Sequence, residues 1–224
     1  MTVTIQLFYF RGKEGRSMKN NLVTASVVLI LLTGLSKITG FIREMVLAYF
    51  YGASAMTDAY ITATTVAIIL IGGITSATAL AYIPRATEAR VNNQDVSYIT
   101  SNLMTACGLL ILIISVTAMF FSRELTWLFA MGFDEQTLTL AAGMTFFILP
   151  FCFIYAMNNI AAGYLQSINS FWFLGASAIL ANIVIITAIS ISNNNPHMLA
   201  LGFACSWVVP AVWAFFLTRK KGLR

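Results

Sequence analysis

The sequence has 224 residues, of which 59% are hydrophobic and only 9% are charged, and its formal net charge is +5. Soluble domains carry about 25% charged residues, so a chain of this composition cannot cover itself with polar side chains in water. The composition excludes a soluble domain and predicts an all-α integral membrane protein.

Six apolar stretches are long enough to cross the hydrocarbon core of a bilayer, which needs about 20 residues of helix. They run over residues 22–51, 57–83, 96–121, 137–165, 171–191 and 198–217. Segments rich in Gly, Pro, Asn and charged residues separate them. We therefore predict a bundle of six transmembrane helices.

The first 17 residues fit this bundle poorly. Their apolar part is too short to span, and no basic residue precedes it as in a signal peptide. Met18 begins a more usual start for a membrane protein. We predict a cytoplasmic extension over residues 1–17, explained equally well by a misassigned start codon. A six-helix lobe over 18–218 and a basic cytoplasmic tail over 219–224 complete the predicted organisation.

The distribution of cations predicts the orientation of the helices. Ten cations lie before the first span, between the second and third, and after the sixth: Arg11, Lys13, Arg16, Lys19, Arg85, Arg90, Arg219, Lys220, Lys221 and Arg224. All ten fall on one side of the membrane if both termini are cytoplasmic, and only Arg123 falls in an outer loop. The basic balance thus indicates membrane topology, and we expect no nucleic-acid partner.

The chain offers little material for an enzyme, a metal site or a cofactor. Its three cysteines lie in apolar runs without metal-ligand spacing, and its one histidine lies in a polar loop. Asp58 has no carboxylate three or four residues away that would help it to hold Mg²⁺. We therefore expect no catalytic, metal or cofactor site.

The segment SKITGFIREM, from Ser36 to Met45, places three charges inside the first predicted span. Each costs ~2.5–3.5 kcal/mol at the centre of a lipid-facing helix. Lys37 and Glu44 are seven residues apart and share a helix face, while Arg43 points about a quarter-turn away. We predict a water-accessible cationic recess suited to phosphate or pyrophosphate. In the alternative interpretation, Arg43 and Glu44 extend to water at the end of a short span.

Two N-terminal motifs resemble a known family. S-K-I-T-G-F-I-R-E, residues 36–44, resembles the S-R-x-x-G-F-x-R-D/E signature of the MviN/MurJ lipid II flippases, and Y-G-A-S-A-M-T-D-A-Y, residues 51–60, resembles their F-G-A-x-x-x-T-D-A-F. Further along, L-Q-S-I-N-S-F, residues 165–171, is similar to L-N-T-W-N-R-F. The resemblance is collinear from Met18 to the end of the chain.

This resemblance implies a fold, a cargo and a set of site residues. Such proteins have two six-helix lobes around a cavity that opens alternately to the two sides. They move an undecaprenyl-pyrophosphate-linked peptidoglycan precursor, lipid II, across the bacterial inner membrane. The resemblance implies that Lys37 and Arg43 engage the pyrophosphate, that Asp58 matches an essential acidic position, and that Glu44 matches a further acidic position. We expect Asp58 to act as counter-ion of the two cations when no ligand is bound.

Two departures from the family leave alternatives open. Residues 64–73, T-T-V-A-I-I-L-I-G-G, replace a family stretch that carries Arg and Pro, and T-S-A-T replaces another at 75–78. A flippase for another polyprenyl-linked oligosaccharide, such as an O-antigen or exopolysaccharide precursor, therefore remains an alternative. The chain also matches one lobe only. That implies a missing second lobe, a second copy of the chain, or a truncated fragment that transports nothing.

Polar side chains within the later spans have two interpretations. Asn158, Asn159 and Asn182 are predicted to form hydrogen bonds between helices, and a role in contacting a sugar stays open. Threonines of the second span either line a wet cavity or bond carbonyls of their own helix.

Overall fold

The computed structural model describes the backbone of residues 2–92, 94, 96–168, 170 and 172–220, and most side chains from Val27 onward. All its regular elements are helices. They are α1 (Thr2–Tyr51), α2 (Ala55–Val91), α3 (Val96–Phe120), α4 (Ser122–Phe129), α5 (Glu135–Ile148), a short 3₁₀ turn (Leu149–Phe151), α6 (Cys152–Ser167), α7 (Trp172–Ile191) and α8 (Pro196–Lys220). The all-α prediction is confirmed for this part of the chain, and the basic tail beyond Lys220 lies outside it.

The predicted number of spanning helices is one too high for the described residues. Five helices are long and apolar enough to cross a membrane: α2, α3, α5 continued by α6, α7 and α8. The described part of α1 is not among them, because every stretch of 18 residues from Val27 to Tyr51 contains Lys37, Arg43 and Glu44. The predicted break after α3 also contains a helix, α4, whose Thr126 donates a hydrogen bond to Thr145 of α5 at 3.1 Å.

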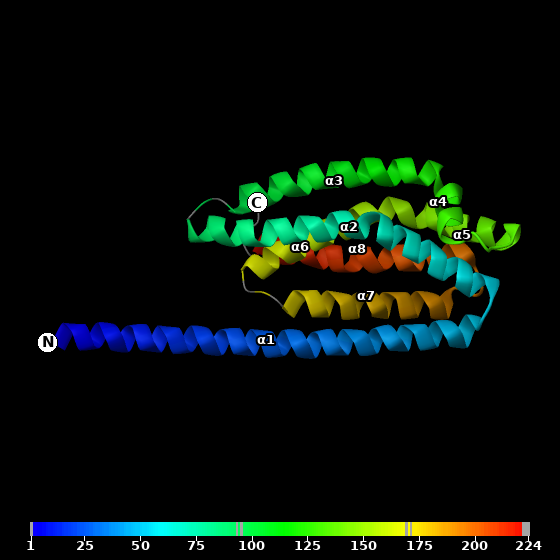
Figure 1. The fold of residues 1–224 in the computed structure, drawn as a ribbon. Helices are drawn as coiled ribbons and strands as arrows, with labels where there is room; N and C mark the ends of the chain where they lie inside the picture. Colours follow the sequence, from blue (N-terminus) through cyan, green and yellow to red (C-terminus); the bar gives the residue numbers. More distant parts are fainter. Residues whose placement is uncertain (1, 93, 95, 169, 171, 221–224) are drawn as a thin grey trace.

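The long helices run side by side, and α1 joins the bundle through one neighbour. Figure 1 shows α1 lying along α7, with α8, α6, α2 and α3 stacked beyond. The contacts of α1 are mainly with α7 and only slightly with α2, and α7 packs in turn on α8. The described part of α1 thus belongs to an α1–α7 layer that is separate from α2 for most of its length.

Two glycines allow this close packing. A Cβ added at Gly175 on α7 would lie 2.5 Å from Leu32 Cβ and 3.0 Å from the Leu32 carbonyl carbon on α1. A Cβ at Gly202 on α8 would lie 2.1 Å from Ala188 Cβ on α7. Small residues let membrane helices approach closely enough for van der Waals packing to hold them together. The backbones of α1, α7 and α8 are therefore fixed in position by contacts that exclude a side chain.

Glycine and asparagine residues, which adopt positive φ values more readily than other residues, end two of the helices. Gly52 has φ +57° and donates its N–H to Ala48 O at 2.9 Å, which closes the end of α1. Asn193 and Asn194 have φ values of 47° and 59° in the turn after α7. Asn195 then accepts from the first N–H groups of α8, the N-terminal cap expected of an asparagine before proline.

Acidification is expected to weaken the cap of α5. Asp134 accepts from the Thr137 hydroxyl at 2.6 Å and from the Gln136 and Thr137 N–H groups at 3.1 and 3.2 Å. The Thr137 hydroxyl is the main reason why the pKa of Asp134 lies below its usual value. A carboxylate with a depressed folded pKa stabilises the fold above its unfolded pKa. This contribution is lost as the pH falls below about 4 and through the lower folded value.

The measurement is thermal unfolding in detergent between about pH 5 and about pH 3. Asp134→Asn keeps a capping oxygen without titrating, so this variant is expected to lose less stability over the range than the original chain. An equal loss in both proteins would contradict the assignment.

Candidate functional site

The centre of the candidate site is Arg43 on α1. Its Nε and Nη2 donate to the same oxygen of Glu44, Oε1, at 3.1 and 2.5 Å. Its Nη1 donates to Oδ1 of Asn182 on α7 at 3.4 Å. The Arg43 side chain is 31% exposed and that of Glu44 is 52% exposed. The guanidinium is thus held between a partner on its own helix and one from the neighbouring helix.

Asn182 ties α7 to the charged segment of α1. Its Nδ2 donates to the carbonyl oxygen of Ser36 at 3.1 Å and to the hydroxyl of Thr39 at 3.0 Å. A Cβ on Gly40 would lie 3.6 Å from that nitrogen, an ordinary van der Waals contact. The predicted bond between helices is therefore confirmed for Asn182, and its partners are residues of the motif itself.

The prediction of bonds between helices fails for the other two asparagines. Asn159 donates from Nδ2 to Tyr155 O of its own helix at 2.8 Å. The Oδ1 atom of Asn158 is buried and accepts no hydrogen bond within the described residues. The two residues are adjacent on α6, and among the described residues neither forms a hydrogen bond with α7.

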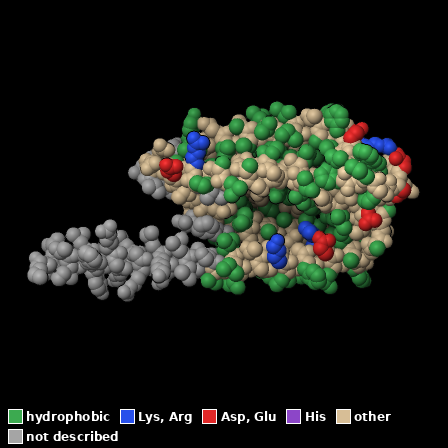
Figure 2. Space-filling view, in the orientation of Figure 1, with side chains coloured by type: hydrophobic (Ala, Val, Ile, Leu, Met, Phe, Trp, Pro, Cys, Tyr) green, Lys and Arg blue, Asp and Glu red, His purple; other side chains and the backbone are tan. Residues whose placement is uncertain are grey.

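A cavity of about 320 Å³ lies between the α1–α7 layer and the helices α2, α6 and α8. Its polar lining comes from Arg43, Asn158, Asn159, Ser177, Asn182 and Ser206. The rings of Tyr155 and Trp207, with centroids 5.1 Å apart, form part of its apolar wall. Figure 2 shows the molecule hollowed between these layers, with positive and negative side chains together along the lower rim. A guanidinium, amides and aromatic rings converge here, as in sites for polar ligands.

Of the four predicted site residues, only Arg43 is among the residues that line this cavity. Lys37 and Glu44 are exposed on α1, and Asp58 is exposed in the first turn of α2. The described residues show the ion pair of Arg43 with Glu44 and not with Asp58. Arg43 lies eight residues before the end of α1, ~12 Å along the helix axis, and Asp58 lies in the first turn of the next helix. The expected ion pair of Arg43 with Asp58 is thus not formed in this conformation, and the role of Asp58 at the site stays a prediction.

The threonines of α2 satisfy their own helix. Thr64 donates to Tyr60 O, Thr75 to Ile71 O and Thr78 to Ile74 O, at 3.0, 3.2 and 2.7 Å. Of the two interpretations of these hydroxyls, the structure favours bonding to the carbonyls of the same helix for these three. The polar character of the cavity comes instead from α1, α6, α7 and α8.

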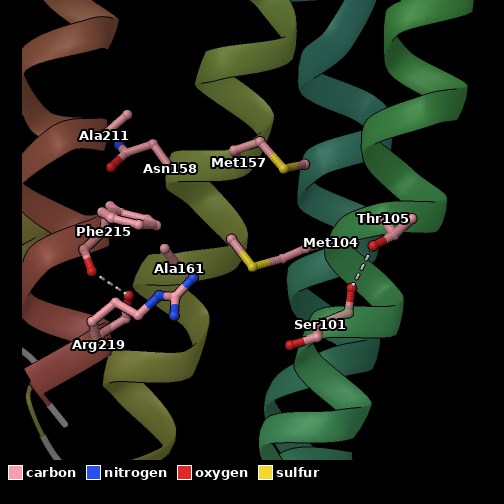
Figure 3. A pocket seen from close by; sticks show the side chains of 10 residues that line it. Ser101, Met104, Thr105, Met157, Asn158, Ala161, Ala211, Phe215 and Arg219 are labelled. Atoms are coloured by element: carbon pink, nitrogen blue, oxygen red, sulfur yellow. Dashed lines mark hydrogen bonds between the residues drawn. The ribbon is translucent and has the colours of Figure 1, made fainter. Parts of the chain in front are cut away.

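A second cavity, of about 390 Å³, lies between α3, α6 and α8. Figure 3 shows Met104 and Met157 extending into it, with Asn158 toward one end and Arg219 toward the other. The guanidinium carbon of Arg219 lies 5.1 Å from the ring centre of Phe215. Its lining combines methionine, alanine and phenylalanine with serine, threonine, asparagine and arginine, and none of the four predicted site residues is part of it.

Several known proteins are similar to this chain in sequence. A family model described as lipid II flippase MurJ matches residues 47–224, a segment that includes Asp58 and begins three residues after Glu44. A probable lipid II flippase MurJ from Buchnera aphidicola subsp. Baizongia pistaciae is 28% identical over 82% of this chain and 37% of the relative. The lipid II flippase MurJ of Burkholderia cenocepacia is 27% identical over 91% of this chain and 40% of the relative.

A solved structure has the same arrangement of helices. It is described as lipid II flippase MurJ in an inward closed conformation, and it aligns with a TM-score of 0.68 and 20% identity over 84% of this chain and 41% of that chain. The chain therefore spans about two fifths of the length of the relatives it matches. On the family match over residues 47–224, the chain belongs to the MurJ lipid II flippase family.

Proposed function

We propose that this chain is the N-terminal lobe of a flippase that moves lipid II, a polyprenyl-pyrophosphate-linked sugar, across the inner membrane by alternating access. Membership of the MurJ family supports the cargo, because the relatives carry that name. The single observation that carries the proposal is the Arg43 guanidinium, which lines a cavity between helices and lies eight residues before the end of α1. An intramembrane cation facing a cavity is expected to serve a ligand or a transport path.

The geometry of Arg43 suits a phosphate. Nε and Nη2 are the parallel donors with which arginine binds two oxygens of a phosphate at once. Glu44 occupies both donors in this structure. An incoming pyrophosphate must therefore replace Glu44 at this edge, so Glu44 is the ligand-free counter-ion in our proposal. A ligand that binds one state of the lobe better than the other shifts the balance between them.

Lys37 and Asp58 have accessory places in this proposal. Lys37 lies six residues before Arg43, ~9 Å along the helix, a separation that a diphosphate with its attached sugar can bridge. Its side chain is exposed and does not pack in the interior of this lobe. Asp58 lies in the first turn of α2, close to the short connection from α1, and we assign it to the coupling of these two helices.

The orientation and the second half of the transporter are also part of the proposal. We place both termini in the cytoplasm, because the cations Arg85, Arg219 and Lys220 then lie together on the inner side. A membrane-impermeant thiol reagent added to cells is expected to label a cysteine at position 134 and not one at 220. The opposite pattern would reverse the topology. A second lobe or a second copy of the chain completes the cavity, with membrane lipids around both.

A second candidate cargo is favoured by one feature of α2. Residues 64–73 are apolar or hydroxylic and supply no cation, where the resembling family carries an arginine. A site with fewer cations suits a lipid-linked oligosaccharide whose head group carries less charge than lipid II. O-antigen or exopolysaccharide precursors belong to this class.

The test is depletion of the gene in its own cell, followed by identification of the lipid-linked precursor that accumulates on the inner leaflet. Lipid II is expected to accumulate. Accumulation of another polyprenyl-linked sugar would favour the second candidate. No accumulation, with the chain present in the membrane before depletion, would identify a fragment that transports nothing.

A further inference from the structure

We infer that Asn182 is a positioning residue, which aims the guanidinium of Arg43 into the cavity. The inference rests on the proposed function only in taking Arg43 as the group that binds the anion. Asn182 lies 139 residues away from Arg43 in the sequence, on α7.

The hydrogen bonds of the Asn182 amide admit one orientation. The carbonyl oxygen of Ser36 can only accept, so the nitrogen Nδ2 must face it, at 3.1 Å. The other hydrogen of Nδ2 is directed to the Thr39 hydroxyl at 3.0 Å. Oδ1 is left pointing toward Nη1 of Arg43, which has donors and no acceptor. Both ends of the amide are used, and reversing it would place two donors against each other.

The position of Asn182 on α7 makes it a firm support. It lies seven residues after Gly175 and six before Ala188, the residues at which α7 meets α1 and α8 without room for a further side chain. A side chain on a helix fixed at both of these points is held against movement. Arginine is long and flexible, and its guanidinium is useful for phosphate recognition only when its planar fork is oriented.

Glu44 alone does not provide this orientation. It binds Nε and Nη2, and it is half exposed and adjacent to Arg43 in the sequence, so it moves with the same helix. Asn182 binds the remaining nitrogen, Nη1, from a different helix. When a phosphate replaces Glu44, the bond from Asn182 remains and keeps the fork directed into the cavity.

The experiment measures binding of inorganic pyrophosphate to the purified full chain in detergent. Asn182→Leu, similar in size and without hydrogen bonds, is expected to bind pyrophosphate about five- to tenfold more weakly, the effect of losing one bond to a charged group. Asn182→Asp is expected to bind at least as weakly, because its carboxylate competes with the anion. Asn102→Leu makes the same change at an exposed site on α3 and is expected to leave binding unchanged.

A double-mutant cycle with Arg43→Gln separates positioning from general stabilisation. If Asn182 acts through Arg43, the Asn182→Leu change has no further effect on binding once Arg43 is gone. A purely structural role would weaken binding to the same extent in both backgrounds. If the leucine variant does not insert, Asn182→Ser removes the same bonds with less bulk and gives the same comparison.

The outcomes separate this inference from the proposed function. Equal pyrophosphate binding by the original chain and Arg43→Gln, or no binding by either, overturns both. Binding that needs Arg43 but survives unchanged in Asn182→Leu or Asn182→Asp overturns only the positioning role. Weakened binding that depends on Arg43 supports it.

Discussion

Replacing Arg43 with glutamine is expected to weaken pyrophosphate binding by about 10- to 100-fold and to stop export of the lipid-linked precursor. Hydrogen bonds to charged groups contribute about 1.5–3 kcal/mol, and each 1.4 kcal/mol is a factor of ten. Glutamine keeps much of the length and polarity of the side chain but removes its charge and its paired donors. Binding to the purified chain and precursor accumulation in cells are the two measurements.

Arg123→Gln is the matched control. Arg123 also pairs with a glutamate, Glu135, but both lie at the end of the bundle that carries α4 and outside the cavity. This variant is expected to bind and export normally. If it fails like Arg43→Gln, or if Arg43→Gln still exports, the anion site is misplaced.

Glu44→Gln is expected to act in the opposite direction at the same site. Removing the competing carboxylate is expected to strengthen pyrophosphate binding about two- to fivefold, the range for a partly exposed ion pair. Weaker binding would show that Glu44 supports the ligand and does not compete with it.

The second large effect concerns the contact of α7 with α8. Gly202→Ala is expected to destabilise the chain by about 1–3 kcal/mol, the usual range for overpacking. The new Cβ would lie 2.1 Å from Ala188 Cβ, and a methyl group on a backbone cannot rotate away. Thermal unfolding in detergent is the measurement, and a clear fall in the midpoint is expected.

Two further variants test the cause. Gly143→Ala adds the same methyl group on α5, where nothing lies within 4 Å, and it is expected to leave stability unchanged or to raise it. Ala188→Gly combined with Gly202→Ala restores the space and is expected to recover most of the loss. Failure of this rescue would mean that the contact is not the cause.

Hydropathy alone located the long helices but not all details of the bundle. The apolar stretches of α2, α3, α7 and α8 each extend over a bilayer thickness, so composition is sufficient to find them. The α4 helix has only eight residues and mixes charged with aromatic side chains, so no span-length signal exists for it. Because of its three charges, the described part of α1 is not among the helices apolar enough to span a membrane. The same three charges pointed to the candidate site.

The site was predictable as far as local spacing determines it. Lys37, Arg43 and Glu44 stood out because charges inside an apolar helix need an explanation. Glu44 was among the predicted site residues, but its pairing with Arg43 was not predicted. Adjacent residues leave a helix in different directions, and only the length of both side chains lets these two meet. The choice of Asp58 followed from the family motif and from its place just after the turn that ends α1, and neither determines which carboxylate pairs with Arg43. The contacts of Asn182 with Ser36 and Thr39 depend on how α7 packs on α1, and no local pattern contains that information.

The attachment of α1 to α7 has a consequence for how such a lobe changes shape. The entrance to the cavity lies between the α1–α7 pair on one side and α2 on the other. The α1 helix makes few contacts with α2. A movement of the α1–α7 pair as one unit relative to α2 would leave the distances from Ser36, Thr39 and Arg43 to Asn182 unaltered. The width of the entrance could then change while the geometry of the groups around Arg43 stays the same.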